Sequence, residues 1–221
     1  MKTTLFLLLS WCIVAKAQAQ DINWRSLNEE SNHLASLYFG ADYSSYYGAS
    51  YAYSIKNKYR PLFIGTEFTL PFGKQVMDDW RWNVNLQTEL WHNEQLSLGT
   101  KLSFVTRRYS SPIATIYNTS GALSLNFGYV RPKVGAVVVA AYDQTMAAHI
   151  SHKLLKEYYP QIRDGWYGAS GGTFKFGVRG NWSHKSWSTY LTVGKAFARD
   201  FKDNPTLPFF AELSVQKRFG K

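Results

Sequence analysis

Hydrophobic and polar residues alternate with a period of two along most of the chain. Between Trp80 and Leu90 the even positions are apolar or threonine, whereas the odd positions, from Arg81 to Glu89, are polar or charged. Because a β-strand places successive side chains on opposite faces, this segment predicts a strand with one apolar and one polar face. The same alternation predicts strands at residues 62–70, 96–104, 123–129, 174–182 and 209–216, while residues 134–142 are apolar on both faces.

The connections between these segments differ in length. Short polar turns are expected near residues 56–58, 92–94, 131–133 and 184–186, and longer connections at 71–79, 107–120, 143–172 and 200–205. In a soluble sandwich the polar faces would meet water, whereas in a membrane barrel they line the lumen and the apolar faces meet lipid. Strict alternation of short and long connections is typical of barrels with tight periplasmic turns and longer outer loops.

The number of strands depends on residues 34–53. Nine strands are obvious, and the first would then begin outside the cell. Splitting the segment at residues 43–46 gives strands at 34–42 and 47–55, and a total of ten, with both termini in the periplasm. The alternative is one long strand, because the alternation runs unbroken from Leu37 to Ile55. The expected fold is therefore all-β, a transmembrane antiparallel up-and-down barrel of about ten strands, with eight as an alternative.

The first residues predict an export signal. Lys2 provides a positive start, residues 5–14 form an apolar run too short to span a bilayer, and Ala17 and Ala19 form an A-x-A cleavage site. The expected organisation is a signal peptide at 1–19, a periplasmic lead-in at 20–33 and a barrel at 34–221. In the lead-in, the spacing of Ser26 and Glu29 suits a capping box, which predicts a short helix or lid at the periplasmic mouth, with a disordered segment as the alternative.

Composition narrows the function classes. The chain has 25 Lys and Arg against 15 Asp and Glu, a formal charge of +10, and 17% aromatic residues. Cleavage would remove Lys2 and Lys16, lowering the charge to about +8, and also the single cysteine, Cys12, so neither disulfides nor thiolate metal sites are expected. The export signal and the alternation argue against nucleic acid as the partner. Several bases fall at the expected periplasmic edge, as solvated turn charges or as contacts to lipid phosphates: Lys56, Lys58, Arg60, Arg131, Lys133, Lys185, Lys217, Arg218 and Lys221.

The export signal, the two-residue repeat, the aromatic strand ends and the loop pattern together resemble small outer-membrane β-barrel proteins of Gram-negative bacteria. The resemblance implies location in the outer membrane after cleavage near Ala19, with outer-membrane lipid and lipopolysaccharide as partners, another envelope protein as a further candidate, and no cofactor. One departure is the C-terminus, where Phe219 is followed by Gly220 and Lys221 instead of ending the chain. Aromatic girdles at both interfaces would explain the rings near strand ends: Tyr51, Tyr53, Trp80, Trp82, Tyr129, Trp182, Trp187 and Phe209.

Strand facing also predicts which charges enter the lumen. Four acids and five bases point inward if the apolar face meets lipid: Asp42, Glu67, Glu89, Glu212, Arg81, Lys101, Arg107, Lys175 and Arg179. Side chains largely fill barrels of about eight strands, so one interpretation is an ion-pair network that fills the lumen. The other is a narrow pore with a slight preference for anions, which the near balance of charge disfavours.

The longest connection holds one candidate catalytic motif. Residues 146–159 have apolar positions at helical spacing, which predicts a short amphipathic helix in the longest outer loop. The H-x-S pair there is similar to the motif of outer-membrane lipid A deacylases, and the resemblance implies Ser151 as nucleophile, His149 as base and Glu157 as the residue that orients the base. On a helix, however, residues two apart do not face each other. His149 and His152 could share one metal ion at helical spacing, but a third ligand is not evident, and we expect no metal site.

The expected function is therefore a non-enzymatic outer-membrane barrel with a structural or envelope-interaction role. A lipid A-modifying esterase or deacylase using Ser151 and His149 is one alternative, and a narrow passive pore is the other.

Overall fold

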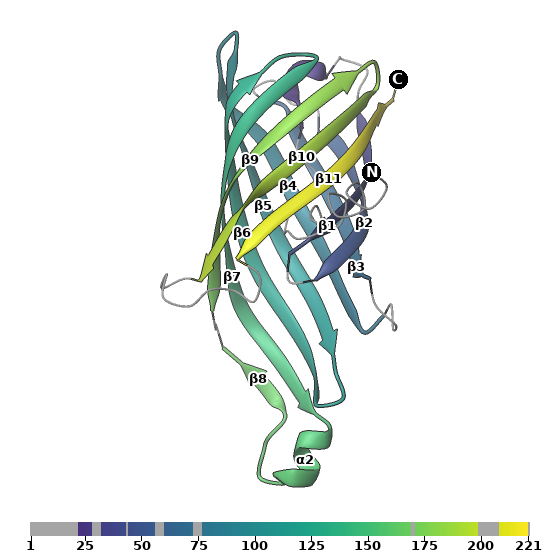
Figure 1. Cartoon of the computed structure of the whole chain (residues 1–221), viewed down its shortest axis with the longest axis vertical. Coiled ribbons are helices and arrows are strands. Elements are labelled where there is room, and N and C mark those ends of the chain that lie inside the picture. Colours follow the sequence, from purple (N-terminus) through teal and green to yellow (C-terminus); the bar gives the residue numbers. More distant parts are fainter. Residues whose placement is uncertain are drawn as a thin grey trace, which may run out of the picture.

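A computed structural model describes residues 22–27, 32–42, 44–55, 60–72, 77–168, 171–198 and 208–220, and its strands form a closed antiparallel barrel (Figure 1). The predicted signal peptide and its cleavage site lie outside these residues. The barrel strands are β1 (His33–Ala41), β2 (Ser45–Ile55), β3 (Leu62–Pro71), β4 (Asp79–His92), β5 (Leu96–Ser110), β6 (Ala114–Val130), β7 (Val134–His152), β9 (Gly172–His184), β10 (Trp187–Ala198) and β11 (Phe209–Phe219).

Each barrel strand pairs with the next along the chain, and β11 pairs with β1 to close the cylinder. An additional short strand, β8 (Gly165–Tyr167), pairs with the end of β7 outside the ten-strand ring. β1 ends at Ala41 and β2 begins at Ser45, so the split predicted near residues 43–46 is confirmed. The alternative of one long strand over residues 37–55 is wrong. The all-β fold and the resemblance to small outer-membrane barrels are thus confirmed at the level of architecture.

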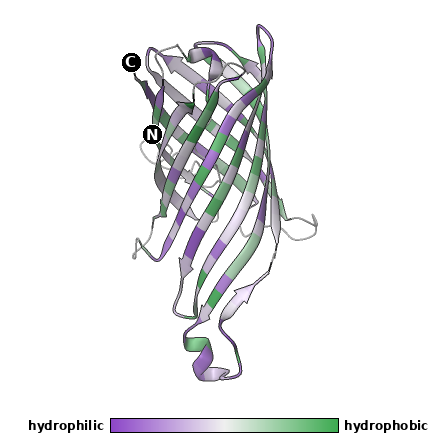
Figure 2. Cartoon of the chain, turned by 180° about the vertical axis from the view of Figure 1, so that it is seen from behind, coloured by the Kyte–Doolittle hydropathy of each residue, from purple (hydrophilic) through white to green (hydrophobic). Residues whose placement is uncertain are grey.

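The faces of the strands follow the two-residue repeat. On β3, Phe63, Glu67 and Thr69 are buried inside the barrel, while Ile64 and Phe68 are exposed on the outside. The stripes of hydropathy along the strands in Figure 2 show the same alternation. A closed sheet leaves no edge strand, so every strand can hold a polar row inside and an apolar row outside. The facing of residues 134–142, which the sequence leaves open, is resolved by the burial of Val139 and the exposure of Val138.

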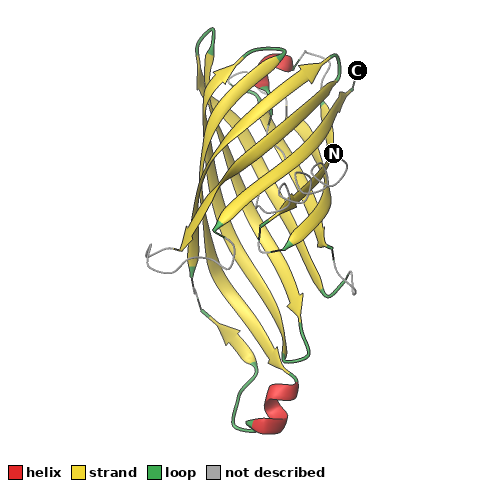
Figure 3. Cartoon of the chain, viewed as in Figure 1, coloured by secondary structure: helices red, strands yellow, loops and turns green. Residues whose placement is uncertain are grey.

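The two rims of the barrel differ. The turn rim carries the connections at residues 93–95, 131–133 and 185–186 together with the start of β1 and the end of β11. The loop rim carries α2 (Leu154–Tyr158) and β8, and lies at the bottom of Figures 1 and 3. β5, β6 and β7 are the longest strands, so the wall projects much farther at the loop rim on their side than on the side of β1 and β11.

Two segments that the sequence predicts to be loops belong largely to strands in the structure. Residues 107–110 belong to β5 and residues 114–120 to β6, so the expected long connection at 107–120 is wrong, and only residues 111–113 join the two strands. Residues 143–152 likewise continue β7, with a β-bulge at Met146, and the expected helix at 146–159 is reduced to α2. The short connections at 42–44 and 111–113 also lie at the loop rim, so short and long connections do not alternate strictly.

The lead-in forms a short element at the turn rim. η1 (Trp24–Ser26) is a 3-10 helix capped by Asn23, whose side chain accepts a hydrogen bond from the Arg25 N–H. This turn is not the helix that the Ser26–Glu29 spacing predicts, because η1 ends at Ser26 and Leu27 after it is extended; Glu29 lies outside the described residues. Ile22 packs with Leu34, Ala52 and Phe63 in a small apolar cluster inside the barrel.

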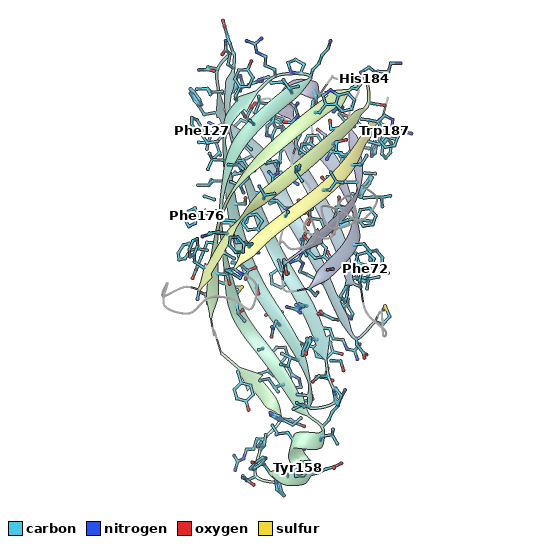
Figure 4. The ribbon with its side chains drawn as sticks, in the orientation of Figure 1. Phe72, Phe127, Tyr158, Phe176, His184 and Trp187 are labelled. Atoms are coloured by element: carbon cyan, nitrogen blue, oxygen red, sulfur yellow. The ribbon has the colours of Figure 1, made fainter. Side chains whose placement is uncertain are left out.

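Exposed aromatic rings gather toward both rims on the outer face. Tyr53, Trp182 and Trp187 lie near the turn rim, and Trp82 and Phe209 lie nearer the loop rim. In Figure 4, Phe127, Phe176 and Trp187 point away from the barrel. Among the described residues, neither helix has the length or apolar character needed to cross a membrane.

Candidate functional site in the barrel lumen

The centre of the lumen holds an ion pair. Lys101 Nζ on β5 lies 2.5 Å from Glu67 Oε1 on β3, and both side chains are about 2% exposed. Asn83 and Asn85 on β4 donate to the two oxygens of Glu67 at 2.8 and 3.1 Å. Gln87 continues this row by donating to Asn85 at 2.9 Å. The buried carboxylate therefore has one cation and two amide donors, which offsets the cost of removing it from water.

Two tyrosines fill the space beside this pair. Tyr46 Oη donates to Glu212 Oε2 at 3.1 Å, and Tyr38 Oη donates to the Phe68 carbonyl at 3.1 Å. Both rings are fully buried and meet edge to face. Tyr38 lies opposite Gly48 in the β1–β2 register, and Tyr46 lies opposite Gly40.

Each of these tyrosine rings covers the glycine opposite it. An added Cβ on Gly48 would collide with the Tyr38 ring, and one on Gly40 would meet Tyr46 Oη at 2.6 Å. The missing side chains therefore make room for rings to lie flat against the inner wall. Phe210 on β11 lies in the same way against Gly194 of the neighbouring β10, and its ring reaches Gly177 of β9 beyond it.

Charges nearer the loop rim form further pairs around a cavity. Arg81 Nη1 lies 3.3 Å from Asp42 Oδ2, and Arg107 donates to both oxygens of Asp79, at 2.7 and 3.1 Å. The cavity has a volume of about 170 Å³. Its lining is almost entirely polar: Asp42, Arg81, Val105, Arg107, Asn118, Ser120, Asp143, Thr145, Thr173 and Lys175.

The turn-rim end of the lumen is occupied by the segment around η1. Arg25 Nη2 lies 3.1 Å from Glu89 Oε1, which also accepts from Ser97 Oγ at 2.6 Å. The Asn23 N–H donates to Tyr190 Oη at 3.0 Å, and its side-chain amide donates to the Arg131 carbonyl at 2.9 Å. Residues 22–27 therefore connect to several strands around the mouth.

Two arginines add further hydrogen bonds in this half of the lumen. Arg179 Nε donates to Thr192 Oγ1 at 2.8 Å, and Arg218 Nη1 donates to Ser26 Oγ at 2.7 Å and to Ser188 Oγ at 2.6 Å. A cavity of about 30 Å³ remains beside Arg179, enough for about two water molecules.

The nine predicted lumen charges all point into the barrel. Asp42, Glu67, Glu89, Glu212, Lys101, Lys175 and Arg179 are buried, whereas Arg81 and Arg107 are partly exposed toward the loop-rim cavity. The structure brings together Glu67 with Lys101 and Asp42 with Arg81, but it pairs Glu89 and Arg107 with residues that the sequence reasoning missed, namely Arg25 and Asp79.

Arg218 corrects one assignment. The sequence predicts a turn charge at the rim, yet Arg218 is 5% exposed and points inward. The inward position of Arg218 could have been predicted from the sequence, because this residue continues the even-numbered inward row of β11 that begins at Phe210 and Glu212.

The candidate catalytic residues lie beyond the barrel at the loop rim. His149 and Ser151 are on β7, not on a helix, and so share a strand face, while Glu157 is exposed on α2. The centre of the His149 ring lies 5.1 Å from the centre of the Trp166 ring on β8. Among the described residues, no contact joins His149, Ser151 and Glu157. His152 points to the opposite face from His149 and lies 3.1 Å from Asp164. Over the described residues, three or more metal-ligating side chains do not cluster anywhere.

Comparisons with known proteins give only a distant likeness. No protein-family profile matches the chain, and no curated protein matches it. Among solved structures, the chain is similar to KdgM porin, alone and in complex with disordered oligogalacturonate. In both cases the identity is 10%, the TM-score is 0.38, and the match covers 84% of this chain and 99% of the porin. This likeness concerns the barrel fold alone.

Proposed function

We propose that this protein is an outer-membrane barrel whose lumen stays closed and whose role is structural, or lies in contacts with other envelope components. The apolar outer face supports a lipid environment, because side chains such as Leu102 and Phe104 on β5 are half exposed on a surface that water would not favour. Farther along β5 the outward row changes to Thr106 and Arg108, as expected where a strand leaves the membrane.

The Glu67–Lys101 pair is the main observation that supports a closed lumen. Its partners Asn83 and Asn85, together with Tyr38 and Tyr46, occupy the middle of the lumen. Residues 22–27 occupy the turn rim, and the cavities beside Arg179 and beside Arg81 measure about 30 and 170 Å³. A selective pore usually shows an excess of one sign, whereas the acids and bases here are nearly balanced and largely paired.

The loop rim supports a role in contacts outside the cell. Tyr158, Trp166, Tyr159 and Tyr167 are 77%, 68%, 52% and 45% exposed on the projecting side of the barrel. Tyrosine and tryptophan are the residues that protein interfaces favour. In the proposed orientation both chain termini face the periplasm and this aromatic tip faces outward.

Conductance in planar bilayers tests the closed lumen. Purified mature protein should give no steady current steps over a range of salt. A variant that lacks residues 22–27 and also carries Tyr38→Ala and Tyr46→Ala should give steps, because it loses the segment at the turn rim and the two rings that fill the middle of the lumen. A shift on an unboiled gel would show that both proteins are folded. Regular steps from the intact protein would overturn the closed state and favour the narrow-pore alternative.

A further inference from the structure

Lys195 is a cation on the apolar outer face of β10. It lies three residues before the loop-rim end of the strand, opposite Phe176 of β9 and Phe209 of β11. Its Nζ lies 5.1 Å from the centre of the Phe209 ring. Among the described residues no carboxylate forms an ion pair with it. A charge on the lipid-facing side of a barrel is unfavourable, and an ionisable residue at membrane depth is a reason to look for a ligand.

An apolar groove starts beside this lysine. The groove is shallow and open to the outside, with a volume of about 670 Å³. Besides Lys195 and two glycines, its lining is apolar: Phe176, Val178, Val193, Phe197, Phe209, Phe210 and Ala211. In Figure 4 the labelled Phe176 projects outward from the wall at this place.

The groove follows from the side chains on three paired strands. One row across the sheet is Phe176, Lys195 and Phe209, and the next row toward the turn rim is Val178, Val193 and Ala211. The small methyl group of Ala211 leaves space beside the larger Phe209, which is 50% exposed. The site therefore combines an apolar channel with a positive charge near its loop-rim end, where Phe197 is the next outward side chain along β10.

We infer that this groove binds lipid A in the outer leaflet, with an acyl chain along Val178, Val193 and Ala211 and a phosphate on Lys195. The inference rests on the proposed orientation, which puts the loop rim, and with it Lys195, at the outer surface. The complementarity is direct, because lysine recognises phosphate as a point charge and the apolar row accepts a hydrocarbon chain.

Retention of lipid A by the purified protein tests the site. Full mature protein is reconstituted in phosphatidylcholine nanodiscs that contain a small mole fraction of bisphosphorylated lipid A, and the lipid retained after release is measured by native mass spectrometry. Lys195→Met should lower the retained lipid A about fivefold, since one lysine near a phosphate contributes about that factor. Ala211→Phe, which fills the groove and keeps the charge, should lower it as well.

Lys217→Met is the matched control. Lys217 also faces outward and lies 5.4 Å from a ring, that of Trp187, but it sits near the turn rim, away from the groove. Its replacement should leave retention unchanged. Equal retention by wild type and Lys195→Met would overturn the inference, as would an equal loss in Lys217→Met. Equal retention of phosphatidylglycerol, or of dephosphorylated lipid A, would overturn the assignment to lipid A. The closed lumen is judged separately by conductance, so either proposal can fail while the other stands.

Discussion

Lys101 Nζ and Glu67 Oε1 meet at 2.5 Å in the middle of the barrel, joining strands β3 and β5 across the intervening β4. Both side chains are almost completely removed from solvent. If one partner is lost, water therefore cannot solvate the charge that remains. The stability of the barrel therefore depends on both charges of this pair being present.

We expect Lys101→Met to lower the free energy of unfolding by about 3–5 kcal/mol, because it leaves Glu67 charged and buried with only its amide donors. Urea unfolding in lipid vesicles would measure this. The double variant Lys101→Met, Glu67→Gln should recover much of the loss, since no charge then remains. Lys133→Met, in the exposed turn at residues 131–133, serves as the control and should change little. An equal loss in the single and double variants would show that packing, and not charge, matters here.

Gly48→Ala should destabilise the barrel by about 1–3 kcal/mol, because the new methyl group would force the buried Tyr38 ring from its place on the inner wall. Gly180→Ala on β9 is the matched control, because a Cβ there meets nothing within 4 Å. Its effect should stay within about 0.5 kcal/mol. Unfolding midpoints of the two variants decide the point, and equal midpoints would contradict the packing of Tyr38 on Gly48.

The loop-rim tip should keep its structure between pH 5 and pH 8. A hydrogen bond from Lys156 and one from the His152 N–H hold the pKa of Asp164 well below its usual value. A lowered folded-state pKa stabilises at any pH above the ordinary value of about 4, and the effect is lost only as the pH falls through the lowered pKa. Hydrogen exchange of residues 153–167 would test this, and Asp164→Asn should raise exchange throughout that range. Loss of protection near pH 6 would point to another group.

Ser151→Ala should leave the acyl pattern of lipid A unchanged in cells that express the protein. Ser151 and His149 share a strand face, but the His149 ring is engaged with Trp166 and no described contact brings Glu157 to it. Mass spectrometry of extracted lipid A provides the measurement. A pattern that changes on expression of the wild type and reverts in Ser151→Ala would establish the esterase alternative.

Cysteine labelling can test the orientation, because the only cysteine of the chain, Cys12, lies in the predicted signal peptide. A membrane-impermeant maleimide should label Tyr158→Cys in intact cells and Pro132→Cys only after the outer membrane is opened. The reverse pattern would invert the barrel and place Lys195 near the inner leaflet.

The alternation of side chains was sufficient to predict the facing of β4, because one face of that strand is apolar along its length. The break between β1 and β2 was predicted from the even number of strands that barrels prefer, since the alternation itself runs unbroken from Leu37 to Ile55. The alternation fails as a signal where strands leave the band that meets lipid. In residues 107–120 both faces are polar or mixed, so the continuing strands looked like a loop. At Met146 the bulge inserts one residue and exchanges the two faces of β7, which shifts the phase of the two-residue repeat at that point.

Inward position was predictable for the lumen charges, but the identity of their partners was not. Arg25 and Glu89 are 64 residues apart, and Asp42 and Arg81 are 39 apart. Whether the members of these pairs come into contact depends on the tilt of the strands and on where η1 enters the barrel mouth. The two-residue repeat contains no information on either. The flat tyrosines were also missed, although each faces a glycine across the β1–β2 ladder.

The seam between β1 and β11, where the ring of His33 stacks on that of Phe219 at 5.4 Å, joins the first and last segments of the barrel to be synthesised. Until β11 has been synthesised and has paired, β1 has no hydrogen-bonding neighbour on that side. The barrel thus cannot be closed by adding strands in order from the N-terminal end until β11 is present. A product that lacks even the last hairpin would remain an open sheet with unpaired edge strands, and such edges favour self-association.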